Sequence, residues 1–217
     1  MKTFKEFICE MAAPSKENSD KIYYHGTTSR EAAKSIAKNG IVAPVVPAKK
    51  NSLTPVAGKV YITPHIDYAS IYAMGGDIAS TEHLMPHHKT DPHGYVFAVH
   101  GHTLKHVQPD EDSVGEMIYK KSNSKLNHLA SYHLGEPTLR KIHDGEYTAW
   151  ARGGKSIMKH LTDDHKNELI HQGAHVAHEG TLHPHAIYRI HHSKIKHLKR
   201  DGSNFFEHAE KIEPHEI

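Results

Sequence analysis

Residues 23–29, Tyr-Tyr-His-Gly-Thr-Thr-Ser, constrain the fold of this chain most, because an apolar run ends there and a helical pattern follows at once. Residues 22–24 are β-branched and aromatic, which predicts a strand. Residues 27–29 are of types that cap helices, and apolar residues then recur at helical spacing until Asn39-Gly40. The pattern predicts a strand, a short polar connection and a helix, with His25 at the exit of the strand.

The His25-Gly26 pair is a candidate ligand-binding turn. A histidine at the end of a strand can project its imidazole into a cleft, and a following glycine leaves backbone N–H and C=O groups open to a ligand. An incidental histidine is the simpler interpretation, because the chain contains 24 histidines among 217 residues. His25 alone therefore does not identify a site.

A second strand and helix follow at Lys59–Pro64 and Ile66–Ala73. Together the two strand-helix pairs resemble the ADP-ribosyltransferase superfamily, in the branch with a His-Tyr-Glu triad. In that branch a His-Gly-(Ser/Thr) strand is followed by a Gly-x-(Ile/Val)-Tyr strand, and a helix carries a second tyrosine eleven residues after the first. Gly58, Tyr61 and Tyr72 fall on this spacing.

The resemblance implies NAD as co-substrate and assigns residues to its binding. His25 would bond ribose hydroxyls, while Tyr61 and Tyr72 would offer flat surfaces for nicotinamide. At Ala69 many family members have a serine that bonds the nicotinamide amide, so this role falls mainly to the Gly26 backbone. The residues expected to bind NAD are His25, Gly26, Thr27, Tyr61, Ser70 and Tyr72.

The catalytic glutamate is expected in the closing strands. Residues 173–190 resemble the family region in which a glutamate precedes a short strand, a proline and an Ile-containing strand, which makes Glu179 the candidate. Glu146 is the rival, because a Glu-Tyr pair opening an apolar strand occurs at this site in poly-ADP-ribose polymerases. A glutamate bonded to the ribose 2′-hydroxyl would stabilise an oxocarbenium-like cation. The expected catalytic residues are Glu179, His25 and Tyr61.

By resemblance the fold is α+β: a split pair of small antiparallel sheets with flanking helices and NAD in the cleft between them. A chain of 217 residues and 24.4 kDa predicts a single core with short extensions. The expected parts are a leader at 1–10, a polar linker at 11–20, the ADP-ribosyltransferase-like domain at 21–200 and a C-terminal extension at 201–217.

The segments between the motifs carry weaker signals. Residues 41–58, with Lys49 and Lys50, contain turn-forming residues and predict an extended loop. Residues 94–100 predict a strand with partly buried alternation. Residues 110–112 predict a turn, and the apolar spacing predicts helices over the ranges 116–134 and 156–171.

Composition excludes several classes of protein. Mean hydropathy of −0.64, without a long apolar run, predicts a soluble chain without a membrane span. A net charge of +2 argues against a dedicated nucleic-acid binder. The single cysteine, Cys9, excludes an internal disulfide and any cysteine-rich zinc site. Because the histidines are spread along the chain, no metal site is expected.

The N-terminus suggests a source. Ile8-Cys9-Glu10 matches the (Leu/Ile)-x-Glu tripeptide after which a prohead protease cuts the leaders of proteins packaged in heads of T-even-type bacteriophages. A plain amphipathic helix is the alternative for this segment. The resemblance implies a monomer carried in the phage head interior and delivered to the host cytoplasm.

The first functional interpretation is mono-ADP-ribosylation of a host macromolecule with release of nicotinamide. The acceptor would be a host transcription or translation protein, or a nucleic acid. One alternative is an RNA 2′-phosphotransferase of the same fold, which relies on arginines and prefers histidine where Tyr61 stands. The other is a non-enzymatic internal head protein that binds DNA.

Overall fold

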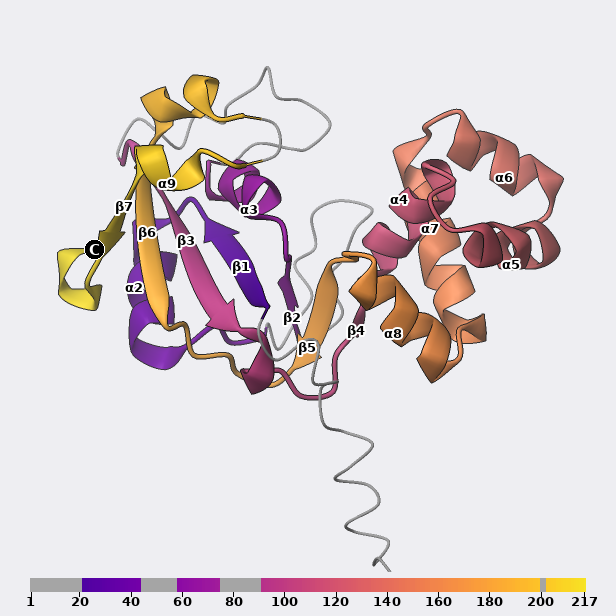
Figure 1. The fold of residues 1–217 in the computed structure, drawn as a ribbon, viewed down its shortest axis with the longest axis horizontal. Helices are drawn as coiled ribbons and strands as arrows, with labels where there is room; N and C mark the ends of the chain where they lie inside the picture. The colour runs from indigo at the N-terminus through magenta and orange to yellow at the C-terminus, as the bar shows by residue number, and fades with distance from the viewer. Residues whose placement is uncertain (1–20, 44–57, 75–90, 200–201) are drawn as a thin grey trace, which may run out of the picture. The chain divides into compact units, whose positions relative to one another are not determined.

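The computed structural model describes residues 21–43, 58–74, 91–199 and 202–217 (Figure 1). The leader, the linker, and Lys49 and Lys50 lie outside these ranges. None of the helices in the described part of the chain is both long and apolar enough to cross a membrane.

The chain divides into two compact units rather than the single core that its length predicts. The second unit has a hydrophobic cluster of its own, built from helices. Of the described residues, the first unit contains 21–43, 60–74, 91–107, 178–199 and 202–217, and the second contains 58–59 and 108–177.

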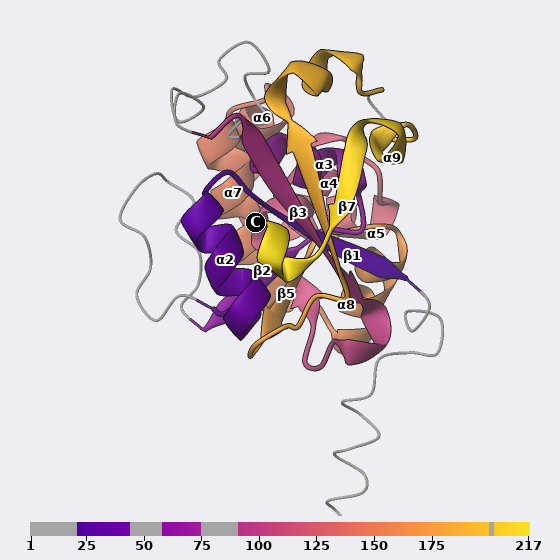
Figure 2. The same cartoon turned by 90° about the vertical axis from the view of Figure 1, so that its left-hand side faces the viewer.

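A four-stranded antiparallel sheet forms the centre of the first unit (Figure 2). Its order is β1-β3-β6-β7, and Gly26 of β1 pairs with Val96 of β3 while Arg189 of β6 pairs with Glu210 of β7. The C-terminal residues therefore complete the sheet. The strands are β1 (Ile22–Thr27), β3 (His93–His100), β6 (Ala186–His191) and β7 (Ala209–Ile212).

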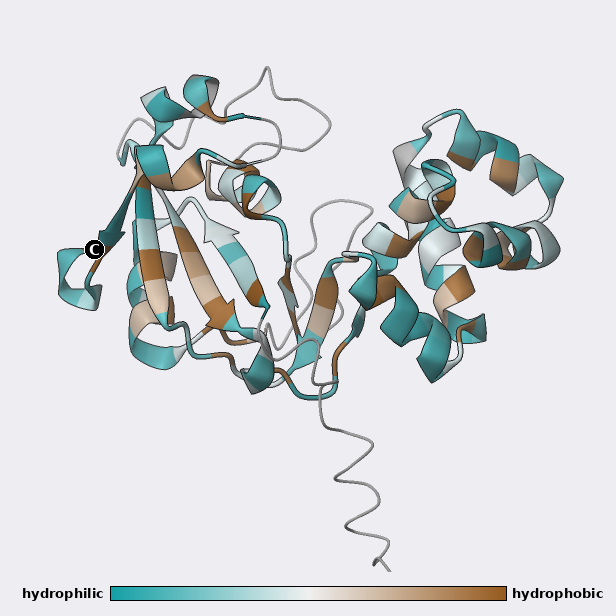
Figure 3. Cartoon of the chain, in the orientation of Figure 1, coloured by the Kyte–Doolittle hydropathy of each residue, from teal (hydrophilic) through white to brown (hydrophobic). Residues whose placement is uncertain are grey.

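Strand β3 is buried from Gly94 to Val99, so the partly buried alternation expected there is wrong. The reason is its position, because β3 lies between β1 and β6 and contacts both α2 (Arg30–Asn39) and α3 (Ile66–Ala73). A strand covered on both faces reads as a continuous apolar run. Figure 3 shows apolar residues along most of β3.

Helix α2 forms as its capping signals predict. The Ser29 hydroxyl accepts a hydrogen bond from the Ala32 N–H at 3.1 Å, which satisfies one of the free donors of the first turn. At the other end the Gly40 N–H donates to the Ile36 carbonyl. Gly40 has a φ of 81°, a conformation that favours glycine.

Helix α3 packs against two glycines of the sheet. A Cβ atom on Gly26 would overlap the Ala69 carbonyl oxygen, and a Cβ on Gly94 would overlap the Ala73 carbonyl oxygen. Ala69 and Ala73 are fully buried and lie one helical turn apart. Small residues on both sides thus let the helix backbone approach β1 and β3 closely.

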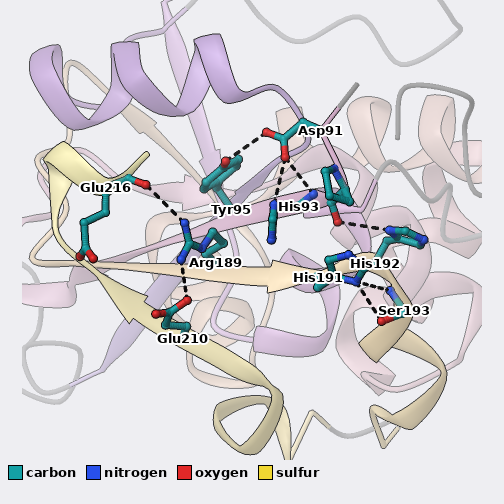
Figure 4. Close-up of polar contacts among 10 residues, drawn as sticks. Asp91, His93, Tyr95, Arg189, His191, His192, Ser193, Glu210 and Glu216 are labelled. Atoms are coloured by element: carbon teal, nitrogen blue, oxygen red, sulfur yellow. Dashed lines mark hydrogen bonds and ion pairs between the residues drawn. The ribbon is translucent and has the colours of Figure 1, made fainter. Parts of the chain in front are cut away.

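Polar contacts join β6 to β7 and surround the start of β3 (Figure 4). The Arg189 guanidinium donates to the Glu210 carboxylate at 2.7 Å and to the Glu216 carbonyl at 3.3 Å, which joins β6 to β7 and to the 3₁₀ turn η6 (Pro214–Glu216). The Asp91 carboxylate accepts from the His93 N–H and the Tyr95 hydroxyl, at 3.0 and 3.1 Å. Other short elements are η3 (Gly101–Thr103), η5 (His192–His197) and α9 (Phe205–His208).

The second unit is a group of short helices. A turn was expected at residues 110–112, but Asp110 instead caps α4, accepting from the Asp112 N–H. The long helices expected at 116–134 and 156–171 are each interrupted. The elements are α4 (Glu111–Tyr119), α5 (Ser124–Leu134), α6 (Glu136–His143), α7 (Tyr147–Ile157), η4 (Met158–His160) and α8 (Asp163–His171).

A second antiparallel sheet has the order β2-β5-β4. Its strands are β2 (Lys59–Ile62), β5 (Val176–Glu179) and β4 (Gln108–Pro109), and Gln108 pairs with Ala177. Two antiparallel sheets with helices confirm the general prediction of an α+β fold.

Candidate functional site

The site begins where β1 and β2 part. Tyr24 and Thr63 form an isolated antiparallel bridge, in which each N–H donates to the other's carbonyl, at 2.7 and 2.9 Å. A ladder continued from this bridge would next pair Gly26 with Tyr61. In the part of the chain that the structure describes it does not continue, and the Tyr61 carbonyl accepts from His25 Nδ1 at 3.0 Å instead.

This geometry determines where the backbone groups of Gly26 point. Backbone N–H and C=O groups alternate in direction along a strand, so Gly26 directs both groups to the same edge as Tyr24. That edge faces away from β3 and lies where β1 separates from β2. Gly26 therefore directs one donor and one acceptor toward the edge of β1 that faces away from β3.

His25 has a defined tautomer. The Tyr61 carbonyl can only accept, so Nδ1 carries the hydrogen. Burial lowers the pKa of His25, against the smaller opposing effect of the bond to Tyr61. In the neutral ring Nε2 keeps its lone pair, and it can accept a hydrogen bond from a hydroxyl group.

Among the other predicted NAD-binding residues, two tyrosines are accessible and two hydroxyl residues form local hydrogen bonds. Tyr61 is partly buried on β2, and Tyr72 on α3 is 51% exposed, so both rings retain accessible surface. Thr27 Oγ1 accepts weakly from the Ser29 N–H at 3.4 Å, within the connection to α2. Ser70 is only 1% exposed, and its hydroxyl donates to the Ile66 carbonyl of its own helix at 2.6 Å. Ser70 therefore has a structural role that the sequence did not suggest.

The two candidate glutamates lie in different surroundings. Glu179 is exposed at the end of β5, and β5 is hydrogen-bonded to β2, the strand that carries Tyr61. Glu146 immediately precedes helix α7 in the second unit. The Glu146 alternative required an apolar strand after Glu146. That prediction is wrong, because residues 147–157 form a helix that packs against α4.

His178 is a residue that sequence reasoning missed. It is buried on β5 next to Glu179, and its Nδ1 accepts a hydrogen bond from the Lys105 N–H at 3.2 Å. Burial lowers the pKa of His178. In the sequence, the signal for a buried histidine was its position directly after Val176 and Ala177. The many other histidines of the chain made this one hard to distinguish.

Among the described residues, these side chains form no metal-binding cluster, and none of them lines the hollow that the second unit contains. No group of three or more His, Cys, Asp or Glu residues in the described ranges is arranged to hold a metal ion. A hollow of about 470 Å³ in the second unit contains no predicted site residue. It is lined by Ser124, Lys125, His128, Leu129 and His165.

Comparisons of the chain with protein-family models, with curated proteins and with solved structures found no match in any of the three. The assignment of a function therefore depends on the residues of the first unit. Of these, His25, Gly26 and Tyr61 meet at one junction, and Glu179 lies on the strand beside β2.

Proposed function

We propose that the chain is a mono-ADP-ribosyltransferase, which transfers ADP-ribose from NAD to a host macromolecule and releases nicotinamide. The observation that carries the proposal is the parting of β1 and β2 at Gly26. There the backbone donor and acceptor of Gly26 lie beside a neutral His25 that bonds to Tyr61. Two small antiparallel sheets that separate at this point support the ADP-ribosyltransferase fold.

The junction suits the nicotinamide end of NAD. A carboxamide has an NH₂ donor and a carbonyl acceptor, which match the C=O and N–H of Gly26. The accessible rings of Tyr61 and Tyr72 supply flat apolar surface for stacking. His25 Nε2 would accept a hydrogen bond from a ribose hydroxyl.

Glu179 supplies the negative charge that the reaction needs. When the bond between ribose C1′ and the nicotinamide nitrogen breaks, the electron pair leaves with nicotinamide and positive charge develops on the ribose. A carboxylate bonded to the 2′-hydroxyl stabilises that charge more in the transition state than in the bound substrate. The same carboxylate can accept the proton of the attacking acceptor group.

The biological setting is part of the same proposal. The tripeptide Ile8-Cys9-Glu10 supports a leader that is cut in the prohead, and so a protein stored in the phage head interior. The protein would then act as a monomer in the host cytoplasm. Its acceptor would be a transcription or translation protein, or a nucleic acid.

Incubation with NAD labelled in its adenylate phosphate and with a host lysate tests the proposal. Label that enters macromolecules as nicotinamide is released is the expected result, and protease and nuclease treatment identify the class of acceptor. NAD-dependent removal of a 2′-phosphate from RNA would instead indicate a phosphotransferase. Inertness toward NAD together with salt-sensitive DNA binding would indicate a non-enzymatic head protein. Glu179→Gln protein is the matched control.

A further inference from the structure

The residue before Glu179 is a histidine with 4% of its surface exposed. Buried polar side chains are costly unless they form hydrogen bonds. His178 meets this need through the Lys105 N–H, which is 73 residues away along the chain and donates to Nδ1 at 3.2 Å. Because a backbone N–H only donates, Nδ1 carries the lone pair and the neutral ring bears its hydrogen on Nε2.

The donor lies in a defined bend that follows β3. Leu104 is buried, and its N–H donates to the Gly101 carbonyl at 3.1 Å. His106, the residue after Lys105, has a φ of 52°, which is uncommon for a residue other than glycine. The hydrogen bond from the Lys105 N–H to His178 thus ties β5 to the bend that follows β3.

A second anchor follows Glu179. Gly180 has a φ of 103° and turns the chain, and Leu182 then forms a backbone bridge with Ile41, with hydrogen bonds of 2.7 and 3.0 Å. Glu179 therefore lies between two fixed points, one residue before it and three residues after it. Consecutive side chains of a strand point to opposite faces, so Glu179 lies on the face opposite His178. Ala177 shares that face and is buried, and Glu179 is exposed where the strand ends.

We infer that His178 is a positioning residue for Glu179, holding the end of β5 through the Lys105 N–H so that the carboxylate keeps its place at the reacting ribose. The inference rests on the proposed function, since the position of Glu179 matters for turnover only if Glu179 acts on NAD. It assigns His178 no contact with substrate.

Two substitutions separate positioning from packing. His178→Leu fills the space but removes the acceptor, whereas His178→Asn retains an oxygen acceptor near the place of Nδ1. Displacement of a catalytic carboxylate by about 1 Å can lower the reaction rate by up to about 100-fold. We expect His178→Leu to lower kcat for nicotinamide release by about 10- to 100-fold with little change in KM for NAD, and His178→Asn to recover most of kcat. His183→Leu, at an exposed histidine, is the control.

Amide hydrogen exchange on the same proteins gives a readout that does not need turnover. Faster exchange at Lys105 and Glu179 in His178→Leu, restored in His178→Asn, is expected. A wild-type kcat in His178→Leu, or equal losses of kcat in both variants, would overturn the positioning role. If the wild-type protein releases no nicotinamide, the proposed function falls, and unchanged exchange in His178→Leu would separately overturn the anchor.

Discussion

Substitution of Gly26 by alanine tests the contact between β1 and α3 directly. A methyl group at this position would overlap the Ala69 carbonyl oxygen and lie 2.7 Å from the Ala73 backbone nitrogen. Both atoms belong to the backbone of α3, so no side-chain rotation can relieve the overlap. The helix must move away from the sheet, and Gly94 on β3 holds the same helix at a second close contact.

The expected cost follows from two opposing effects. Overpacking a well-packed interior costs about 1–3 kcal/mol, and a clash with backbone belongs at the upper end. Replacing glycine by alanine also restricts the unfolded chain, which offsets about 0.4–1 kcal/mol. A net loss of about 2 kcal/mol in the free energy of unfolding corresponds to a decrease of about 4–8 °C in the melting temperature of a chain of this size.

Thermal unfolding followed by circular dichroism measures this loss, and amide hydrogen exchange locates it in α3. Gly58→Ala is the matched control, because a Cβ there meets no atom within 4 Å and only the φ of 84° opposes it. It should cost less, about 1 kcal/mol. A Gly26→Ala protein that melts at the wild-type temperature, with unchanged exchange in α3, would refute the close contact. Lost turnover would then indicate a ligand-binding role for Gly26 alone.

Three further results are expected. Glu179→Gln should lower turnover by about 10²- to 10³-fold with little change in NAD binding, while Glu146→Gln stays active; the reverse result would transfer the catalytic role to Glu146. Tyr61→Ala should weaken NAD binding by about 0.5–1.5 kcal/mol more than Tyr61→Phe, as measured by calorimetry, and equal losses would refute ring stacking. Burial raises the pKa of Asp110 to about 8. The folded state therefore keeps a proton that the unfolded chain releases above a pH of roughly 4. The free energy of unfolding should for this reason fall as pH rises from about 5 to about 8. Asp110→Asn keeps the helix cap and should reduce that fall in melting experiments.

The parts of the fold predicted best are those with local signals. The helix that starts after Ser29 and ends before Gly40 has a cap at each end, and both caps form hydrogen bonds within a few residues. The helix Ile66–Ala73 also has the predicted bounds. Propensity and capping act over single turns, so one sequence is enough to find them.

The helical unit was predicted poorly because its boundaries depend on distant contacts. Asn123 interrupts the predicted helix at 116–134, since its side chain caps α5 at the Leu126 N–H and also donates to Gln172, 49 residues later in the chain. Gly115 and Gly154 allow α4 and α7 to pack closely, which apolar periodicity does not reveal. Such pairs become visible only once the chain is folded.

For the predicted site residues, the structure shows contacts that the sequence pattern did not indicate. Gly26 was interpreted as a residue that leaves its backbone open to a ligand, and the structure adds a second reason for glycine, because the missing side chain makes room for α3. The bond from His25 to the Tyr61 carbonyl joins two strands whose register no local pattern specifies. The role of Glu179 stays a prediction.

The pairing of Gln108 with Ala177 has a consequence for the chain entropy of folding. Residues 108–177 form a closed loop in sequence, and an unstructured loop of that length would lose about 4 kcal/mol in closure entropy when its ends meet. The helices between these ends have a hydrophobic core of their own. Burial of that core offsets the loss of closure entropy, so the pairing of β4 with β5 does not have to supply the whole of that free energy. The intervening helices are then free to diverge in length and composition, provided that their ends return to the same register and deliver Glu179 to the same place.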